Sequence, residues 1–179
     1  MTVENFRDEV RKGQRFEFGK NWKRFLKSLN EERIKQAELS LKTMLDVDRL
    51  DGKTFLDIGS GSGLFSLAAK NLGAKVLSFD FDESSVWCTS ELKKRFYEGD
   101  TSWKVTHGSV LDDVFLKKLG QFDFVYSWGV LHHTGDMWRA LDNVVELVNP
   151  NGSLFIALYN NQKFASRYWT FVKKVYNKF

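Results

Sequence analysis

Apolar positions along this chain change their spacing in a regular way. Between residues 30 and 46 they recur three or four positions apart, with Ile34, Ala37 and Leu41 on one side, which predicts an amphipathic helix. Asn30 stands before this run as a candidate N-cap. An Asp-Gly turn follows, and beyond it short runs rich in β-branched and aromatic residues alternate with longer runs of helical spacing.

These alternating runs predict five strands with a helix between each strand and the next. The expected strands are residues 53–58, 74–80, 102–108, 122–128 and 152–160. The expected helices are residues 63–72, 83–96, 112–119 and 136–148. Strands that are separated by helices pair in parallel through right-handed crossovers and leave helices on both faces. The predicted fold class is therefore α/β, a doubly wound, mostly parallel sheet.

Glycine and proline support the boundaries of these elements. Gly73 follows the helix predicted at residues 63–72, a position that favours glycine because the chain turns there. The "NPNG" stretch of residues 149–152 is expected to end the last crossover helix before its strand begins.

Composition is that of a globular protein and predicts one domain over residues 1–179. Of these residues 42% are hydrophobic and 28% are charged, a balance unlike that of disordered or fibrous chains. We divide the domain into a helical cap (1–48), a core (49–160) and a C-terminal amphipathic helix (161–179). No stretch is apolar enough to cross a bilayer or resembles a secretion signal, so we expect a cytoplasmic protein.

Cysteine content and charge narrow the function further. Cys88 is the single cysteine, so an internal disulfide is excluded and a buried apolar role is expected; no metal site is predicted. The net charge is +4, and basic and aromatic residues gather at both ends of the chain. We interpret these ends as solvated helix faces and keep a nucleic-acid footprint as the alternative.

The first candidate ligand-binding motif is "FLDIGSGSG", residues 55–63, at the end of the first predicted strand. Gly59, Gly61 and Gly63 lack a Cβ where the backbone must turn sharply and approach a ligand closely. In doubly wound sheets ligands bind beyond such strand ends. Asp57 precedes the glycines, and Asp80 ends the next strand, where an acid can bond to a ribose diol.

The charge beside the turn selects between two classes of cofactor. A dinucleotide fingerprint requires a third glycine where Leu64 stands, so a nicotinamide enzyme is disfavoured. The carboxylate of Asp57 would repel a diphosphate but attract a cationic nucleoside. S-adenosylmethionine has a ribose, an ammonium and a sulfonium group, and it has no phosphate.

At these residues the chain resembles the class I S-adenosylmethionine-dependent methyltransferases. "LDIGSGSG" resembles the first motif of the family, "HGSVLDD" the adenine-contacting segment, and "FDFVYSWGVLHHTGDMWRAL" the fourth motif of the small-molecule branch that includes quinone methylases. The resemblance covers about residues 50–160. It implies a Rossmann-like core that binds S-adenosylmethionine and releases S-adenosylhomocysteine. The cofactor-binding residues that it implies are Asp57, Gly59, Ser60, Gly61, Gly63, Asp80, Phe81, Ser109, Val110, Ser127 and Trp128.

Methyl transfer from a sulfonium is an in-line displacement that requires good orientation and, for a hydroxyl or acidic carbon, removal of a proton. His132 and His133 follow the fourth predicted strand at the edge that holds the glycine turn. We interpret one of them as a base or substrate-orienting group, and a structural role for one with a solvated role for the other is the alternative. His107 is expected to end the third strand without a catalytic part.

The same loop bears on the acceptor. Relatives that methylate nucleobase amines or glutamine amides commonly carry two prolines where this chain has "SWGV", so a small-molecule acceptor is favoured.

Aromatic residues near the start of the chain are a further candidate for the acceptor site. Phe16, Phe18 and Trp22 surround a glycine, and they fit either a lid over the cofactor or a helix docked on the sheet.

Two further strands close the sheet in most class I methyltransferases, and this chain ends before them. The sheet edge is then completed by the C-terminal amphipathic helix, by another protomer or not at all. Because an exposed edge strand invites pairing, a homodimer is predicted. The function predicted is methyl transfer to a small-molecule acceptor. The alternatives are an RNA methyltransferase, which the basic ends favour, and a cofactor-binding domain without its own turnover.

Overall fold

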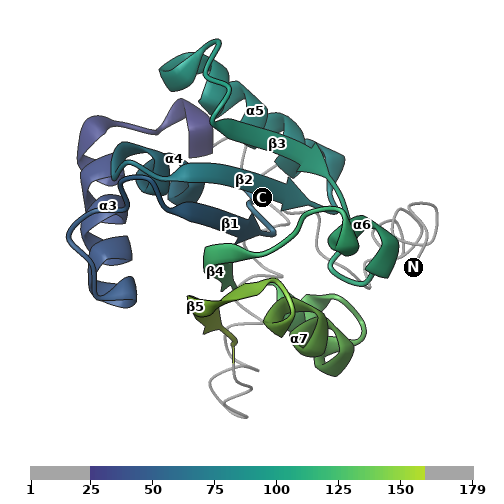
Figure 1. Ribbon diagram of the computed structural model, residues 1–179. Helices are drawn as coiled ribbons and strands as arrows, with labels where there is room; N and C mark the ends of the chain where they lie inside the picture. The colour runs from purple at the N-terminus through teal and green to yellow at the C-terminus, as the bar shows by residue number, and fades with distance from the viewer. Residues whose placement is uncertain (1–24, 160–179) are drawn as a thin grey trace, which may run out of the picture.

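Five parallel strands form the middle layer of the computed structural model, which describes residues 25–159 (Figure 1). The strands are β1 (Thr54–Ile58), β2 (Lys75–Asp80), β3 (Trp103–His107), β4 (Phe122–Trp128) and β5 (Val148–Ala157). Their order is β3-β2-β1-β4-β5, and every neighbouring pair is parallel. The predicted doubly wound sheet is confirmed. The strand order reverses between β1 and β4, which is where such sheets bind ligands.

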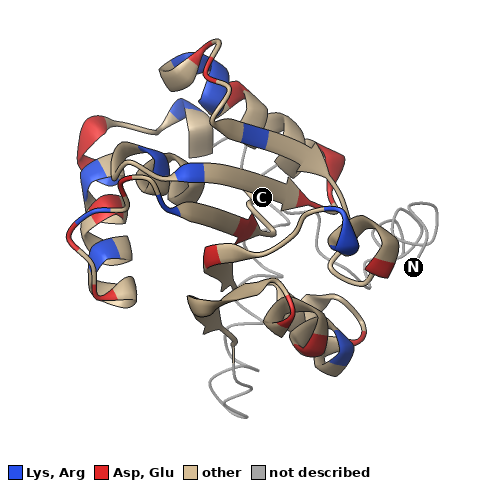
Figure 2. Ribbon diagram, in the orientation of Figure 1, with Lys and Arg blue, Asp and Glu red and all other residues tan. Residues whose placement is uncertain are grey.

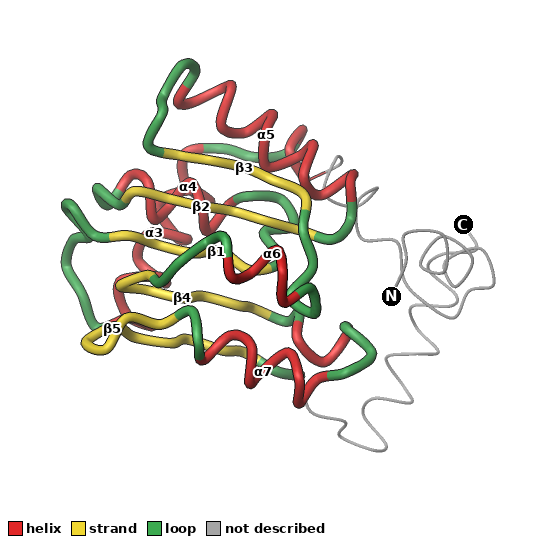
Figure 3. Tube along the Cα trace, turned by 45° about the vertical axis from the view of Figure 1, so that its right-hand side comes forward, coloured by secondary structure: helices red, strands yellow, loops and turns green. Residues whose placement is uncertain are grey.

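Helices cover both faces of this sheet (Figures 1 and 3). One face packs against α3 (Glu31–Leu45), α4 (Leu64–Asn71) and α5 (Glu83–Tyr97). The other face packs against α6 (Asp113–Lys117), the short 3₁₀ helix η1 (Leu131–His133) and α7 (Met137–Val145). An apolar layer therefore lies on each face of the sheet, between the strands and the helices.

Helix α3 forms as its sequence pattern predicts. The side chain of Asn30 accepts a hydrogen bond from the backbone N–H of Arg33 at 2.9 Å, a cap that stabilises a helix by about 1 kcal/mol. Ile34, Ala37 and Leu41 are its buried residues. The spacing of these three residues puts them on one side of the helix, and α3 packs with that side toward the sheet.

Alternation along β1 decides which side chains reach the site. Phe55 belongs to the apolar cluster under α3 and α4, whereas Leu56 and Ile58 belong to the cluster under α6 and α7. Successive strand residues point to opposite faces, so Asp57 lies on the side of Phe55. A carboxylate is thereby placed inside the layer beneath α4.

The boundary predicted at residues 149–152 is wrong. Helix α7 ends at Val145, and β5 begins at Val148 and includes these four residues. Phe122 pairs with Val148 and Phe124 with Ser153, so β5 carries extra residues against β4. Proline cannot donate to a strand ladder, and the irregularity in β5 absorbs it.

Further predictions concern the cysteine, the two ends of the chain, membrane spans and metal sites. Cys88 is buried, as expected. Residues 1–24 and 160–179, and with them Phe16, Phe18 and Trp22, lie outside the described residues. Between residues 25 and 159 no helix has the length and apolarity needed to cross a membrane. The same stretch contains no group of three metal-ligating side chains.

Candidate active site

The glycine turn joins β1 to α4 and has the backbone conformation that its sequence predicts. Gly59, Gly61 and Gly63 have φ of +74°, +55° and +79°, a region that side-chain-bearing residues rarely adopt. A Cβ at Gly59 would stand 2.4 Å from a methyl carbon of Val130, and one at Gly63 would stand 2.9 Å from the backbone of Thr89. Glycine is therefore required here both by conformation and by contact.

Helix α5 holds this turn in place through Thr89. The hydroxyl groups of Ser60 and Thr89 lie 2.9 Å apart, and the Thr89 hydroxyl also donates to the carbonyl of Gly61 at 3.4 Å. Both side chains are buried. Thr89 is not predicted from the sequence, where its only signal is a small polar residue on the buried side of α5.

Asp80 ends β2 and ties it to the glycine turn. Its Oδ2 accepts from the backbone N–H of Gly61, and its Oδ1 accepts from the backbone N–H of Asp82, both at 2.9 Å. Burial raises the pKa of its carboxyl group to about 6 although these bonds lower it. A carboxylate oxygen can accept two hydrogen bonds, so each oxygen of Asp80 keeps capacity for a ligand hydroxyl.

Asp57 lies deeper, beneath α4, and its side chain is only 2% exposed. Its Oδ2 accepts a hydrogen bond from the hydroxyl of Ser66 at 2.5 Å. Burial, with a smaller contribution from the nearby Asp80, raises the pKa of its carboxyl group to about 7. Within residues 25–159 no lysine or arginine offsets this effect. Acidic colour at the arrow tips of β1 and β2 shows the same concentration of negative charge (Figure 2).

Buried acids with raised pKa values make the folded state bind protons that the unfolded chain releases. The free energy of unfolding is therefore expected to fall as pH rises from 4 to 7 and to level off above, because the proton-linked stability is lost as Asp57 ionises. Asp57→Asn removes that ionisation and should unfold with a free energy higher than the original protein by on the order of 2 kcal/mol at pH 8. Urea unfolding across this pH range measures both.

A control for this experiment is Asp123→Asn. The backbone N–H and the hydroxyl of Thr54 each donate to Asp123 at 2.8 Å, and they lower the pKa of its carboxyl group. This variant should lose stability at pH 8 instead of gaining it. An Asp57→Asn protein that is equally destabilised at pH 8 would contradict the account of Asp57.

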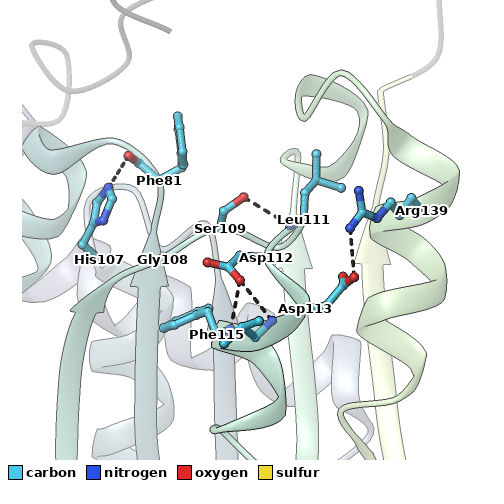
Figure 4. A pocket seen from close by; sticks show the side chains of 10 residues that line it. Phe81, His107, Gly108, Ser109, Leu111, Asp112, Asp113, Phe115 and Arg139 are labelled. Carbon is cyan, nitrogen blue, oxygen red and sulfur yellow. Dashed lines mark hydrogen bonds and ion pairs between the residues drawn. The ribbon is translucent and has the colours of Figure 1, made fainter. Parts of the chain in front are cut away.

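Beyond the tips of β2 and β3 lies an open cavity of about 540 Å³ (Figure 4). On one side of it the Nε2 of His107 forms a 2.9 Å hydrogen bond with the carbonyl of Phe81. In the middle the hydroxyl of Ser109 accepts from the backbone N–H of Leu111 at 3.2 Å. The far wall holds an ion pair between Asp113 and Arg139, at 2.9 Å. His107 ends β3, as expected.

Two other predicted cofactor-binding residues have buried side chains. Val110 belongs to the apolar cluster under α6 and α7, and its carbonyl accepts from the side chain of Asn143 at 2.9 Å. Ser127 is fully buried and donates to the carbonyl of Ile58 at 3.2 Å, which links β4 to β1. Both side chains support the strand tips from beneath.

Trp128 ends β4 and is part of a cluster of aromatic rings. Its ring stacks on those of Phe65 and Phe155, with both centroid distances 6.0 Å. Its indole N–H donates to the hydroxyl of Tyr159 at 3.2 Å. The side chain remains 42% exposed. A flat, partly accessible aromatic surface therefore lies at this strand tip, beside the point where the strand order reverses.

The two candidate histidines differ in their surroundings. Both belong to η1, which follows the segment whose Val130 contacts Gly59. Within the described chain, neither ring nitrogen of His132 has a hydrogen-bond partner although both are buried, and burial lowers the pKa of this imidazole. His133 is exposed, with its ring centroid 3.9 Å from that of His132. His132 thus offers a neutral imidazole with two unused polar atoms.

The sequence of this chain matches a known protein family and several curated proteins. A family model described as a methyltransferase domain matches residues 23–173. A ubiquinone biosynthesis O-methyltransferase of Coxiella burnetii is 29% identical over 127 residues, which are 71% of this chain and 52% of that protein. A protein of the same description from Pseudomonas paraeruginosa is 29% identical over 62% of this chain and 46% of its own. The chain thus spans about half the length of the curated relatives it matches.

Solved structures share the fold. A putative S-adenosylmethionine-dependent methyltransferase from Methanococcus maripaludis superposes with a TM-score of 0.65 at 17% identity, over 89% of this chain and 74% of that one. A SAM-dependent methyltransferase from Aquifex aeolicus has a TM-score of 0.59 at 20% identity, over 79% and 72% of the two chains. At these identities the likeness shows the Rossmann-like fold.

Proposed function

We propose, since this chain belongs to the methyltransferase domain family, that it transfers a methyl group from S-adenosylmethionine to a small-molecule acceptor. The observation that carries the proposal is the pairing of Asp80 with the N–H of Gly61 beside a buried Asp57. A glycine turn bordered by two carboxylates suits a cationic nucleoside and opposes a diphosphate. The sequence relatives named for O-methylation support the same reaction class.

The residues at this edge fit the cofactor in both polarity and charge. Asp80 keeps acceptor capacity for ribose hydroxyl groups. Asp57 is a buried carboxyl group without a cation to offset it in the described chain, and the ammonium group of the cofactor would supply one. Phe81 and Ser109 line the cavity beyond β2 and β3, and this cavity would receive the adenine, with Val110 packed below.

The cofactor supplies an activated methyl group when bound, and the chain contributes orientation and proton removal. We assign His132 the role of base, because its imidazole is neutral and its nitrogens are unpaired in the described chain. The exposed ring of Trp128 would orient a flat acceptor, and the aromatic residues Phe16, Phe18 and Trp22 would exclude water as a lid.

His132→Ala is expected to reduce kcat by about a hundredfold or more, since positioned bases contribute about 10² to 10⁴ in rate. The affinity for S-adenosylhomocysteine should change little. His133→Ala, on the exposed neighbour, is the matched control and should keep most of its activity. Steady-state kinetics and calorimetry on both variants measure this split. Equal loss of kcat in both, or a larger loss in His133→Ala, would contradict the assignment of the base to His132.

The acceptor class is tested by methyl transfer from cofactor labelled in its methyl group. Phenolic and quinol compounds are offered in one series and structured RNA in another. We expect label in the small molecules, because the exposed aromatic cluster around Trp128 suits a flat acceptor. Label in RNA alone would establish the alternative that the basic ends of the chain favour. No label in either series, despite binding, would favour a domain without turnover.

The remaining parts of the proposal are its compartment and assembly. We propose the cytoplasm, where a buried cysteine such as Cys88 stays reduced. Strand β5 is the outer strand of the described sheet on one side and could pair with a second copy. Light scattering at micromolar concentration tests the homodimer, and a monomeric mass contradicts it.

A further inference from the structure

A chain of buried polar groups runs beneath the glycine turn, between α4 and the sheet. The indole Nε1 of Trp103 donates to the hydroxyl oxygen of Ser78 at 3.0 Å, which lies 2.7 Å from that of Ser66. Ser66 donates in turn to Asp57 at 2.5 Å. None of the four side chains is more than 2% exposed. Buried groups of this kind are shielded from water, so their hydrogen bonds depend on one another.

Chemistry at the two ends determines the direction of every hydrogen bond in this chain. An indole N–H can only donate, and an ionised carboxylate can only accept. The hydroxyl hydrogen of Ser78 must therefore point to Ser66, and that of Ser66 to Asp57. If Asp57 were protonated on the oxygen that faces Ser66, the Ser66 hydroxyl would reverse and the Ser78 hydrogen would lose its acceptor in the chain. The arrangement therefore favours the carboxylate over the acid.

We propose that Trp103, Ser78 and Ser66 are positioning residues that keep Asp57 ionised and oriented toward the cationic end of the cofactor. The inference rests on the proposed function, because it takes the cofactor as the cation that Asp57 meets. Trp103 begins β3, whereas the site lies at the opposite ends of the strands. This tryptophan thus influences cofactor binding across the sheet without contact with the ligand.

The surroundings of Asp57 explain why such support is needed. Burial and, to a smaller extent, the charge of Asp80 on β2 raise the pKa of Asp57. Burial also raises the pKa of Tyr126 on β4, and the negative charge of Asp57 adds to this shift. Helix α4 presents Ser66, whose hydroxyl group and, to a smaller extent, whose backbone N–H lower the pKa of Asp57. In the described part of the molecule no cation takes part. The hydroxyl chain therefore opposes burial and the charge of Asp80, together with the backbone N–H of Ser66.

The test follows the aspartate carboxyl carbons by ¹³C NMR as the pH of the ligand-free protein is varied. Ser66→Ala removes the hydroxyl donor to Asp57 and keeps the backbone N–H. It should raise the midpoint of Asp57 by about one pH unit, the size expected for a hydrogen bond to a charged group. Trp103→Phe removes only the first donor. It should raise the midpoint by about 0.3 units, because a fraction of each bond is transmitted along a chain. Ser78→Ala serves in place of Trp103→Phe if that variant does not fold.

The matched control is Leu92→Val, which trims a fully buried side chain of the same apolar cluster and removes no hydrogen bond. Its midpoint should equal that of the original protein. Calorimetry with S-adenosylhomocysteine at several pH values should show the loss of affinity on acidification moving upward by the same amounts in Ser66→Ala and Trp103→Phe. Unchanged midpoints in both variants would overturn the proposal. Shifted midpoints in a protein that does not bind S-adenosylhomocysteine at all would overturn the proposed function instead.

Discussion

Asp80→Ala is expected to weaken the binding of S-adenosylhomocysteine by at least about a hundredfold at pH 8. The carboxylate is the proposed partner of the ribose hydroxyl groups, and hydrogen bonds to a charged group each contribute about 1.5–3 kcal/mol. The substitution also removes the acceptors for the backbone N–H groups of Gly61 and Asp82, which donate to the two carboxylate oxygens at 2.9 Å. Loss of both effects exceeds about 2.7 kcal/mol, which corresponds to a hundredfold change in Kd.

Asp80→Asn should be almost as damaging as alanine, although it preserves the size of the side chain. Both carboxylate oxygens face a backbone N–H, so one of these donors would meet the amide nitrogen of asparagine. Asp48→Ala removes an exposed acid from the segment between α3 and β1, away from the strand tips, and is the control for a change in net charge. Isothermal calorimetry measures all three. Affinities within threefold of the original protein for Asp80→Ala would remove Asp80 from the site.

Gly63→Ala is the second large effect that we expect, and it concerns stability as well as binding. The residue has φ of +79°, and an added Cβ would stand 2.9 Å from the Cα of Thr89, where backbone cannot give way as a flexible side chain can. Left-handed backbone alone costs about 1–2 kcal/mol for alanine. The contact adds to this cost, so the melting temperature should fall by about 10 °C, and cofactor affinity should be lost with the shape of the turn.

Gly99→Ala separates the two contributions. Gly99 has φ of +76°, close to that of Gly63, but nothing lies within 4 Å of an added Cβ. Its melting temperature should fall by only about 3 °C, the cost of the backbone conformation. Calorimetric scans of the two variants provide the comparison. Equal melting temperatures would show that α5 does not press on the turn at Gly63.

Hydrophobic periodicity was sufficient to predict the fold, because a strand and a helix repeat their apolar positions differently. The strand tips then follow from topology: in a parallel sheet Asp57 and Asp80 must approach the same edge. Residues 149–152 show where this reasoning fails. Their turn-forming composition indicates a break, but pairing with β4 continues on both sides, and the strand absorbs the irregularity.

Contacts between distant elements could not be predicted in the same way. Thr89 contacts the glycine turn because α5 packs beside it, and Trp103 contacts Ser78 because β3 pairs with β2. No local pattern encodes this packing. Local sequence likewise does not distinguish His132 from His133. The packing around η1 buries both ring nitrogens of His132 and leaves His133 exposed. Small hydroxyl residues at inward positions, such as Ser66 and Ser78, were the available signal.

The central claim is that the glycine turn and its two carboxylates bind a cationic nucleoside. Isothermal calorimetry at pH 8 with S-adenosylmethionine, S-adenosylhomocysteine and NAD in parallel tests it most directly. We expect binding of both sulfur compounds and none of NAD. Binding should weaken as the pH falls through 7 to 6, where Asp57 and Asp80 take up protons. Binding of NAD without either sulfur compound would contradict it.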